Sequence, residues 1–299
     1  MGKTEWALLI LLSIFWGSSF FFMKVALQSL STFTIVFARV GIAALLLIIY
    51  VYATGQHLPG TAVAWKRFII LGTLRAALPI SLIVWAETRI DSNLAGILNS
   101  TSPLFTAVIA HYLTTDDKLT SNRLLGIVIG MFGVSILIGP DALRGLGSQV
   151  IAQLAMLGAT CSYGFAAVYG RQFKGTPPAV SAAGMLAGAT ILTLPLAALE
   201  QPWTLSPSLQ SLGAILGLSF LSTALAFIIW FQLIFRAGAS NTSMVTFLIP
   251  ITALTLGILF LHEEIVATSI IGLMTILGGL AVAQNRWFKR FLSIKQTGV

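Results

Sequence analysis

The chain has 299 residues, of which 57% are hydrophobic and only 9% are charged, and its formal net charge is +8 at pH 7. Soluble domains carry about 25% charged residues, so this composition excludes an ordinary soluble protein. The basic residues lie mainly at the ends of apolar stretches, which argues against nucleic acid as a partner. The single cysteine, Cys161, excludes a disulfide framework and a cysteine-based metal site within one chain.

Ten apolar stretches follow one another, and each is long enough to cross a bilayer, which takes about 20 mostly apolar residues. The links of about 4 to 12 residues are typical of helix–helix connections and leave no room for a soluble domain. The first stretch lacks a small-residue cleavage site, so we interpret it as a retained span rather than a signal peptide. We predict an all-α integral membrane protein with ten transmembrane helices, at approximately 6–27, 32–53, 66–86, 93–112, 122–139, 150–170, 179–199, 211–232, 239–261 and 268–287.

The basic residues predict the orientation of the chain. If the N-terminus is cytoplasmic, twelve of the 17 Lys and Arg residues face the cytoplasm, whereas Lys24, Arg89 and Arg144 face the other side. Lys and Arg accumulate in cytoplasmic loops. We therefore expect a multi-pass protein of the cell inner (plasma) membrane with both termini in the cytoplasm.

The two halves of the chain repeat each other. Each half has five spans, an odd number, so the second copy enters the membrane from the opposite face, as in the inverted repeats of secondary transporters. We predict one repeat at 1–140, an inverted one at 148–290, and a cytoplasmic tail at 291–299. Chance similarity of apolar helices is the weaker alternative, because the matches keep a common order. They pair Trp16-Gly17 with Tyr163-Gly164, Lys24 with Arg171, Leu71-Gly72 with Leu216-Gly217, Trp85 with Trp230, Pro103 with Pro250, and Asp117 with Glu263.

These features together resemble the drug/metabolite transporter superfamily, EamA type, over nearly the whole chain. They are the Trp-Gly of the first span, the Pro103/Pro250 pair, the acidic residues after spans 4 and 9, and the glycine-rich spans 5 and 10. Within that family the chain is most similar to the ten-span amino-acid exporters, including the aromatic amino acid exporters. The resemblance implies export of amino acids or related metabolites from the cytoplasm. One departure is Asp116-Asp117, where the family usually has Glu.

Arg75 is the ionisable residue nearest the middle of a predicted span, and such residues are functional candidates. Its counterpart in the other repeat is Phe220, so repeat symmetry requires no charge there. We predict that Arg75 faces a central cavity and binds a substrate carboxylate, to which its planar fork is suited. The alternative is that Arg75 pairs with a helix carbonyl or another internal group. Arg39 is about 12 Å deep, within reach of snorkelling, so we expect a structural role for it.

Acidic residues are scarce within the predicted spans. Of the nine, only Glu87 lies inside one, at its extreme end, and His57, His111 and His262 lie at or near loops. A proton relay normally needs such groups at depth. We therefore expect facilitative or weakly coupled transport.

Polar residues precede the proline of span 4, in the order Asn99-Ser100-Thr101-Ser102-Pro103. Proline frees the carbonyl four residues earlier, here that of Asn99. We predict that this carbonyl, Asn99 and Ser102 line the cavity and suit a substrate ammonium group. The alternative is a proline kink stabilised by Ser and Thr contacts between helices. Pro250 follows a looser version of the pattern, and both prolines are candidate hinges.

The aromatic residues Trp16, Trp85, Tyr163 and Trp230 occupy matched repeat positions. A cavity lined by them suits apolar or aromatic substrate side chains. Packing within the protein is the alternative and the more common fate of such residues.

Two oppositely charged pairs are candidate gates. The predicted topology places Lys24 and Glu263 at the outer face, and Arg171 and Asp117 at the inner face. Each pair could close one side in turn. The more ordinary interpretation is that all four are solvated, and such pairs contribute about 0–1 kcal/mol.

Glycines predict one close contact between helices. Span 5 contains Gly126, Gly130 and Gly133, and span 10 contains Gly272, Gly278 and Gly279. Small residues let helix backbones approach closely. We expect these two spans to pack together, within a monomer or across a homodimer.

Other classes of protein fit the sequence less well. It has no nucleophile–base motif, no HExxH or GxSxG and no P-loop, so we expect neither an enzyme nor an ATP-driven pump, and we expect no cofactor. The leading hypothesis is an alternating-access transporter whose partners are a small-molecule substrate and the lipid bilayer. Alternatives are transport of another metabolite or drug-like compound, or lipid flipping. A receptor-like role is disfavoured by the short loops.

Overall fold

The computed structural model describes residues 2–115, 119–138, 148–173, 175–237, 242 and 245–284, and the regular elements among them are all helical. The helices are α1 (Lys3–Ala26), α2 (Thr32–Ala53), α3 (Ala62–Gly72), α4 (Leu78–Glu87), α5 (Ser92–Asn99), α6 (Ser102–Leu113), α7 (Ser121–Ile138), α8 (Ser148–Tyr169), α9 (Pro178–Leu199), α10 (Leu209–Ser219), α11 (Ala226–Ala237), α13 (Val245–Leu261) and α14 (Ala267–Gln284).

Among these residues, seven helices are long and apolar enough to cross a membrane, and two of them continue through a π-helical segment. The first of these runs over Ala62–Glu87, where α3 and α4 continue through a π-helical segment at Thr73–Ala77. The second runs over Leu209–Trp230, where α10 and α11 continue through a π-helical segment at Phe220–Leu225. The helices α13 and α14 are apolar but shorter.

The predicted fourth span is not one continuous helix. α5 ends at Asn99 and α6 begins at Ser102, so the chain breaks directly before Pro103. Pro103 is the second residue of α6, in the first turn, where a proline costs no hydrogen bond, whereas in a helix interior it removes one. The matched Pro250 differs, because it lies inside α13 without a break.

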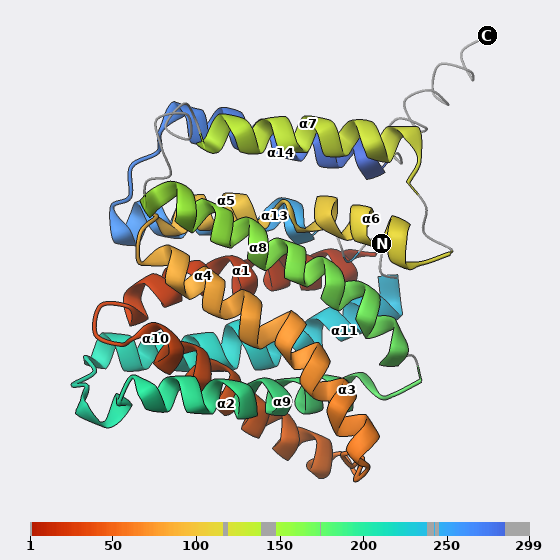
Figure 1. Ribbon diagram of the computed structural model, residues 1–299, viewed down its shortest axis with the longest axis vertical. Coiled ribbons are helices and arrows are strands. Elements are labelled where there is room, and N and C mark those ends of the chain that lie inside the picture. Colours follow the sequence, from red (N-terminus) through yellow and green to blue (C-terminus); the bar gives the residue numbers. More distant parts are fainter. Residues whose placement is uncertain are drawn as a thin grey trace.

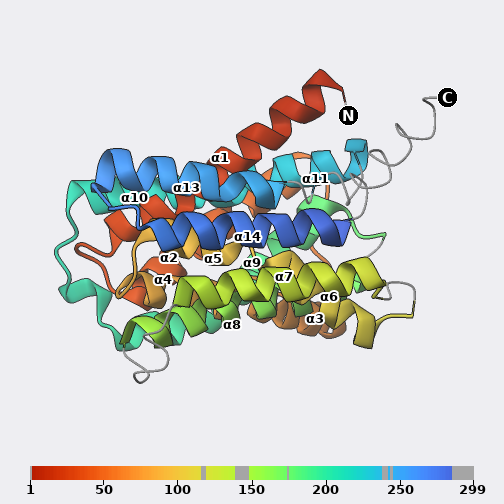
Figure 2. The ribbon, with the colours of Figure 1, turned by 90° about the horizontal axis from the view of Figure 1, so that it is seen from above.

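The helices run side by side along one direction (Figure 1). The start of α1 and the end of α14 lie at the same end of the bundle, which Figure 2 shows from above. We call this the basic end, since Lys66, Arg67, Arg171 and Arg236 belong to helix ends and links there. The opposite end, which we call the acidic end, carries Glu87, Asp91, Glu200, Glu263 and Glu264.

The glycines of spans 5 and 10 pack α7 against α14 within the monomer. A Cβ added at Gly279 would lie 2.5 Å from the carbonyl oxygen of Gly126 and 2.6 Å from the backbone nitrogen of Gly130. A Cβ at Gly133 would lie 2.9 Å from the carbonyl oxygen of Gly272. The two backbones therefore touch, and together these helices form an outer layer of the bundle (Figure 1).

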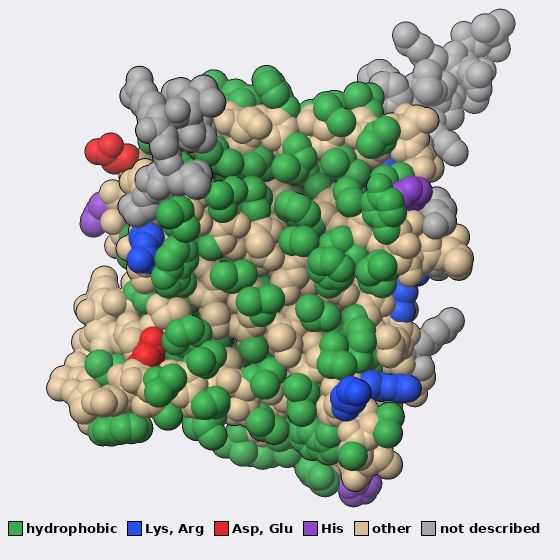
Figure 3. Space-filling model, in the orientation of Figure 1, with side chains coloured by type: hydrophobic (Ala, Val, Ile, Leu, Met, Phe, Trp, Pro, Cys, Tyr) green, Lys and Arg blue, Asp and Glu red, His purple; other side chains and the backbone are tan. Residues whose placement is uncertain are grey.

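The outer surface is apolar. Figure 3 shows a face covered by hydrophobic side chains, with charged groups confined to the two ends. Within the outer layer formed by α7 and α14, large apolar side chains are exposed, among them Leu124, Val128, Phe132, Ile271 and Met274. An exposed apolar surface of this extent is typical of a lipid-facing bundle rather than of a soluble monomer.

Candidate functional site

Arg75 lies among three aromatic rings. It projects from the π-helical segment Thr73–Ala77, and its Cζ is 4.6 Å from the ring centroid of Tyr163, 5.9 Å from that of Phe227 and 6.0 Å from that of Trp16. We call these three rings the aromatic cage. Arginine within about 6 Å of a ring centroid gains a favourable cation–π interaction. Three predicted site residues, Trp16, Arg75 and Tyr163, are thus brought together.

Trp230 extends the aromatic cage at one edge. Its ring meets that of Phe227 edge to face, with centroids 6.4 Å apart, and Phe227 meets Trp16 in the same way at 6.5 Å. Phe227 was missed in the sequence because repeat matching selects aromatic residues that have aromatic counterparts. A usable signal was its position three residues before Trp230, on the same side of a helix.

The guanidinium of Arg75 carries hydrogen-bond donors that the described residues leave unused. Arginine has five N–H donors. Among the residues that the structure describes, no acceptor bonds to the Arg75 guanidinium, and by solvent-accessible surface the residue is partly exposed. The donors are therefore available to a ligand with a planar anionic group.

Arg39 contrasts with Arg75. It does not snorkel to the surface, as the sequence suggested, but is buried. Its Nε donates to Oγ1 of Thr223 at 3.0 Å, and its Nη1 lies 3.4 Å from Sδ of Met23. The expectation of a structural role agrees with these contacts, although the mechanism differs.

Both π-helical segments receive side-chain hydrogen bonds from other helices. The hydroxyl of Ser162 on α8 donates to the carbonyl oxygen of Leu74 at 2.7 Å, and Arg39 bonds to Thr223 in the second segment. Single π turns within α-helices occur frequently at functional sites. Here the first one fixes the point from which Arg75 projects.

The matched glycines Gly17 and Gly164 explain how the rings of Trp16 and Tyr163 are positioned in the aromatic cage. A Cβ at Gly17 would lie 2.5 Å from Cβ of Thr252, so α1 crosses α13 closely there. A Cβ at Gly164 would lie 2.7 Å from Cδ1 of Ile109, so α8 crosses α6 in the same manner. Since Trp16 and Tyr163 directly precede these glycines, each ring is placed by a close helix crossing.

The break before Pro103 is internally bonded. The carbonyl oxygen of Asn99, which we expected to be free for a substrate, accepts a 2.7 Å hydrogen bond from the hydroxyl of Ser102. The hydroxyl of Thr101 bonds to that of Thr160 on α8 at 3.2 Å. The Thr101 contact fits the alternative of Ser and Thr contacts between helices, whereas Ser102 bonds within its own segment and is partly exposed. The Asn99 side chain remains partly exposed.

Lys24 and Glu263 do not pair with each other in this structure. Nζ of Lys24 donates to the backbone oxygens of Glu87 and Ile90, at 2.8 and 2.7 Å. The Glu263 carboxylate accepts from the backbone nitrogens of Ser92 and Asn93, at 2.7 and 2.9 Å, and so caps the start of α5. Both residues therefore bind helix ends rather than forming the predicted ion pair.

The predicted inner gate is only partly visible. Asp117 lies outside the described residues. Arg171 is exposed at the basic end and borders a cavity of about 540 Å³, which Leu74, Thr114, Thr115 and Phe165 also line. This cavity reaches the π-helical segment next to Arg75.

Trp85 lies apart from the aromatic cage. Its ring stacks under the guanidinium of Arg89, whose Cζ is 4.1 Å from the ring centroid. Ten residues of helix separate Trp85 from Arg75, which is about 15 Å at 1.5 Å per residue. This favours a place near the acidic end over a place at the site.

Glu87 was misjudged from the sequence. It is the last residue of α4, as expected for a span end, but its side chain is 0% exposed. Neither carboxylate oxygen has a hydrogen-bond partner among the described residues. A buried acid is thus present after all.

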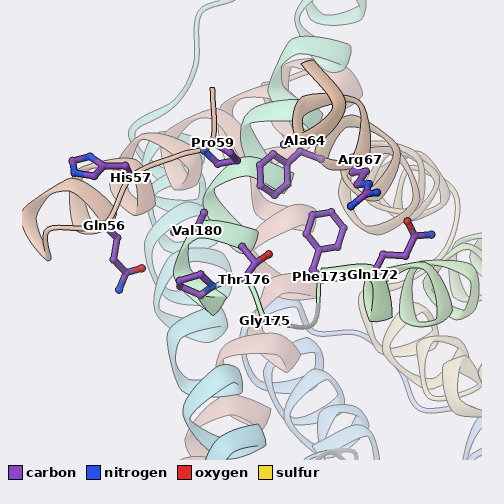
Figure 4. Close-up of a pocket in the computed structure, with 12 residues that line it drawn as sticks. Gln56, His57, Pro59, Ala64, Arg67, Gln172, Phe173, Gly175, Thr176 and Val180 are labelled. Atoms are coloured by element: carbon purple, nitrogen blue, oxygen red, sulfur yellow. The ribbon is translucent and has the colours of Figure 1, made fainter. Parts of the chain in front are cut away.

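A second cavity, of about 470 Å³, opens at the basic end (Figure 4). The stacked rings of Phe68 and Phe173 border it, with centroids 5.3 Å apart, together with Arg67 and Gln172. It lies between the α2–α3 link and the α8–α9 link. None of the aromatic cage lines it.

An all-helical bundle of apolar, membrane-length helices with an apolar exterior is typical of an integral membrane protein. The model of the EamA-like transporter family matches residues 4–139 and again residues 150–283. The chain therefore belongs to the EamA-like transporter family, within the drug/metabolite transporter superfamily, and is a multi-pass membrane transporter of small molecules.

Relatives agree with this assignment. The uncharacterized transporter YoaV of Bacillus subtilis is 27% identical over 274 residues, covering 91% of this chain and 94% of that protein. Protein PecM of Dickeya dadantii is 24% identical, with 90% and 89% covered. The inner membrane transporter YedA of Escherichia coli is 26% identical, with 83% and 80% covered. One solved crystal structure shares the fold, with a TM-score of 0.69 and 17% identity over 95% of this chain and 98% of that one.

Proposed function

We propose that the protein is a secondary transporter that exports amino acids or related small zwitterionic metabolites across the plasma (inner) membrane by alternating access. The observation that carries this proposal is the Arg75 guanidinium, which is surrounded by aromatic rings and has no acceptor among the described residues. A cation that the protein leaves unpaired within a membrane is expected to serve a ligand.

The chemistry of the site favours a carboxylate bearing an apolar or aromatic side chain. The planar guanidinium can bind a carboxylate through two parallel hydrogen bonds. The rings of Trp16, Phe227 and Trp230 offer an apolar surface beside it. A different anionic metabolite or drug-like compound would satisfy the same groups and is the second candidate. Lipid flipping is the third candidate.

The proposed architecture has ten crossings in two inverted repeats, at 1–140 and 148–290, followed by the tail at 291–299. Three observations support it. The two π-helical segments begin 147 residues apart, at Thr73 and Phe220, the same offset as between Gly17 and Gly164. The contact of α1 with α13 corresponds to that of α8 with α6. The family model matches the chain twice.

The proposed access route from the cytoplasm uses the cavity of about 540 Å³ beside Leu74. In this arrangement the basic end faces the cytoplasm, as the bias in Lys and Arg predicts. The break before Pro103 and the proline inside α13 are the proposed hinges. A single cysteine introduced at Arg236 in a Cys161→Ser background, labelled from either side, tests the orientation.

The test of function is uptake of labelled threonine, methionine and phenylalanine into proteoliposomes, for wild type and Arg75→Ala. Arg89→Ala is the matched control, because its guanidinium also lies over a ring but is exposed. We expect uptake by wild type and by the Arg89 variant, and loss of uptake in the Arg75 variant. No uptake of any amino acid by wild type would refute the amino-acid assignment. Equal uptake by both variants would remove Arg75 from the site.

A further inference from the structure

The Glu87 carboxyl group at the acidic end is the buried polar group that the proposed function leaves unexplained. Its side chain is fully buried, and both oxygens lack hydrogen-bond partners among the described residues. Burying an ionised carboxylate without such partners costs several kcal/mol. A neutral, protonated carboxyl group avoids most of that cost.

The charged groups near Glu87 come from three other parts of the chain. Lys24 on α1, Arg39 on α2 and Glu263 in the α13–α14 link are close enough to act on it electrostatically. The helices α5 and α8, which also pack around α4, contain no Asp, Glu, Lys, Arg or His.

Each of these three neighbours is already engaged with other groups. Nζ of Lys24 donates to the two backbone oxygens at the end of α4, not to the Glu87 carboxylate. Arg39 bonds to Thr223, and Glu263 accepts from Ser92 and Asn93. An ionised Glu87 would be expected to draw the Lys24 ammonium, since charge-assisted bonds are the stronger ones. The observed geometry is that of a neutral Glu87.

We propose that Glu87 is a proton-binding site that controls the acidic end of the transporter. The carboxyl group holds its proton while it is buried, as it is in this structure, and releases it to the outer solution when that end opens and water reaches it. Opening therefore becomes easier as the outer pH rises. This inference rests on the proposed alternating access, and it adds a buried acid to the expectation of facilitative or weakly coupled transport.

The sign of the effect follows from the proton count. The closed state binds one proton more than the open state, so raising the pH favours opening. The ratio of open to closed states changes by up to about tenfold per pH unit for one proton. A Gln at position 87 mimics the neutral acid permanently and removes this dependence.

The first experiment measures opening without any substrate. A cysteine at Ile90, which is 5% exposed beside Glu87, is labelled from outside with an impermeant maleimide in a Cys161→Ser background. Labelling of a cysteine at Thr88, which is exposed, corrects for ionisation of the thiol itself. We expect the ratio of the two rates to rise from pH 6 to pH 8 with Glu87 and to stay flat with Glu87→Gln. Glu264→Gln, with its exposed side chain, serves as the matched control and should behave as wild type.

A flat ratio with Glu87 intact, or a rise that persists in Glu87→Gln, overturns the proposal. The second experiment needs no added cysteine and covers the case in which a variant does not fold. Infrared difference spectra of the wild-type protein against Glu87→Asp and Glu264→Gln should show a protonated-carboxyl band near neutral pH that only the Glu87 substitution shifts. Absence of such a band in wild type also overturns the proposal. Neither readout requires transport, so both remain decisive if no amino acid is carried.

Discussion

The hydroxyl of Ser162 on α8 donates a 2.7 Å hydrogen bond to the carbonyl oxygen of Leu74, the residue directly before Arg75. The bond links the backbone next to Arg75 to α8, the helix that also carries Tyr163. The position of the guanidinium over the Tyr163 ring is therefore set by two contacts with one helix, one polar and one aromatic.

Ser162→Ala should weaken this arrangement. It leaves the part-buried Leu74 carbonyl without its side-chain partner, and loss of such a hydrogen bond costs about 0.5–1.5 kcal/mol. We expect a lower melting temperature and a higher KM for transport, because Arg75 is held less firmly. Ser135→Ala is the control, since its hydroxyl is exposed and bonds only within its own helix. Equal effects of the two substitutions would mean that the Leu74 bond has no special role.

Tyr163→Leu should weaken substrate binding more than Tyr163→Phe. Phenylalanine keeps the ring 4.6 Å from Arg75, whereas leucine removes it. Cation–π interactions contribute about 0.5–2 kcal/mol, so the leucine variant should bind substrate about 2- to 30-fold more weakly. Binding is measured by scintillation proximity with labelled substrate, and Tyr50→Leu, at an exposed position of α2, is the control. If the phenylalanine variant is as impaired as the leucine variant, the hydroxyl rather than the ring is what matters.

Gly279→Ala should destabilise the protein, while the neighbouring Gly278→Ala should not. An added Cβ at Gly279 meets the backbone of Gly126 and Gly130, whereas one at Gly278 meets nothing within 4 Å. Overpacking of this kind typically costs about 1–3 kcal/mol. Thermal unfolding followed by fluorescence-detected size exclusion compares the two variants. A Gly278 variant as unstable as the Gly279 variant would contradict the described packing of α7 on α14.

Glu263→Gln should lower stability more than Glu264→Gln. The Glu263 carboxylate accepts hydrogen bonds from two backbone nitrogens at the start of α5, and a negative charge is favourable at a helix N-terminus. Loss of such a cap costs about 0.5–2 kcal/mol. Hydrogen exchange of the amides of Ser92 and Asn93 provides the local measurement. Unchanged protection in Glu263→Gln would show that the cap is dispensable.

Much of the architecture could be predicted from the sequence because bilayer thickness dictates the length of an apolar span. The predicted second span, 32–53, coincides with α2, and the glycines of spans 5 and 10 correctly pointed to the contact of α7 with α14. The π-helical segments could not be predicted, since an extra residue rotates the following helix face, and this rotation leaves little trace in spans that are apolar on most sides. The break at Ser100-Thr101 was anticipated only as a kink at Pro103.

The candidate site could be predicted only in part. Arg75, Trp16 and Tyr163 stand out by charge, by depth and by repeat matching, and the structure brings them together. Phe227 has no such mark, because the sequence contains 19 phenylalanines. The burial of Glu87 was missed because position along a span says nothing of which side chains surround its end. Three-dimensional packing alone supplies that information.

The contact between α7 and α14 has a consequence for handling the protein. The two helices touch through main-chain atoms and glycines, so shape complementarity holds them together rather than exclusion from water. Exchange of lipid for a detergent micelle leaves this cause of pairing intact. We therefore expect α7 and α14 to stay in contact during extraction and purification. This should hold even if water enters and loosens the packing around the buried Glu87 carboxyl group.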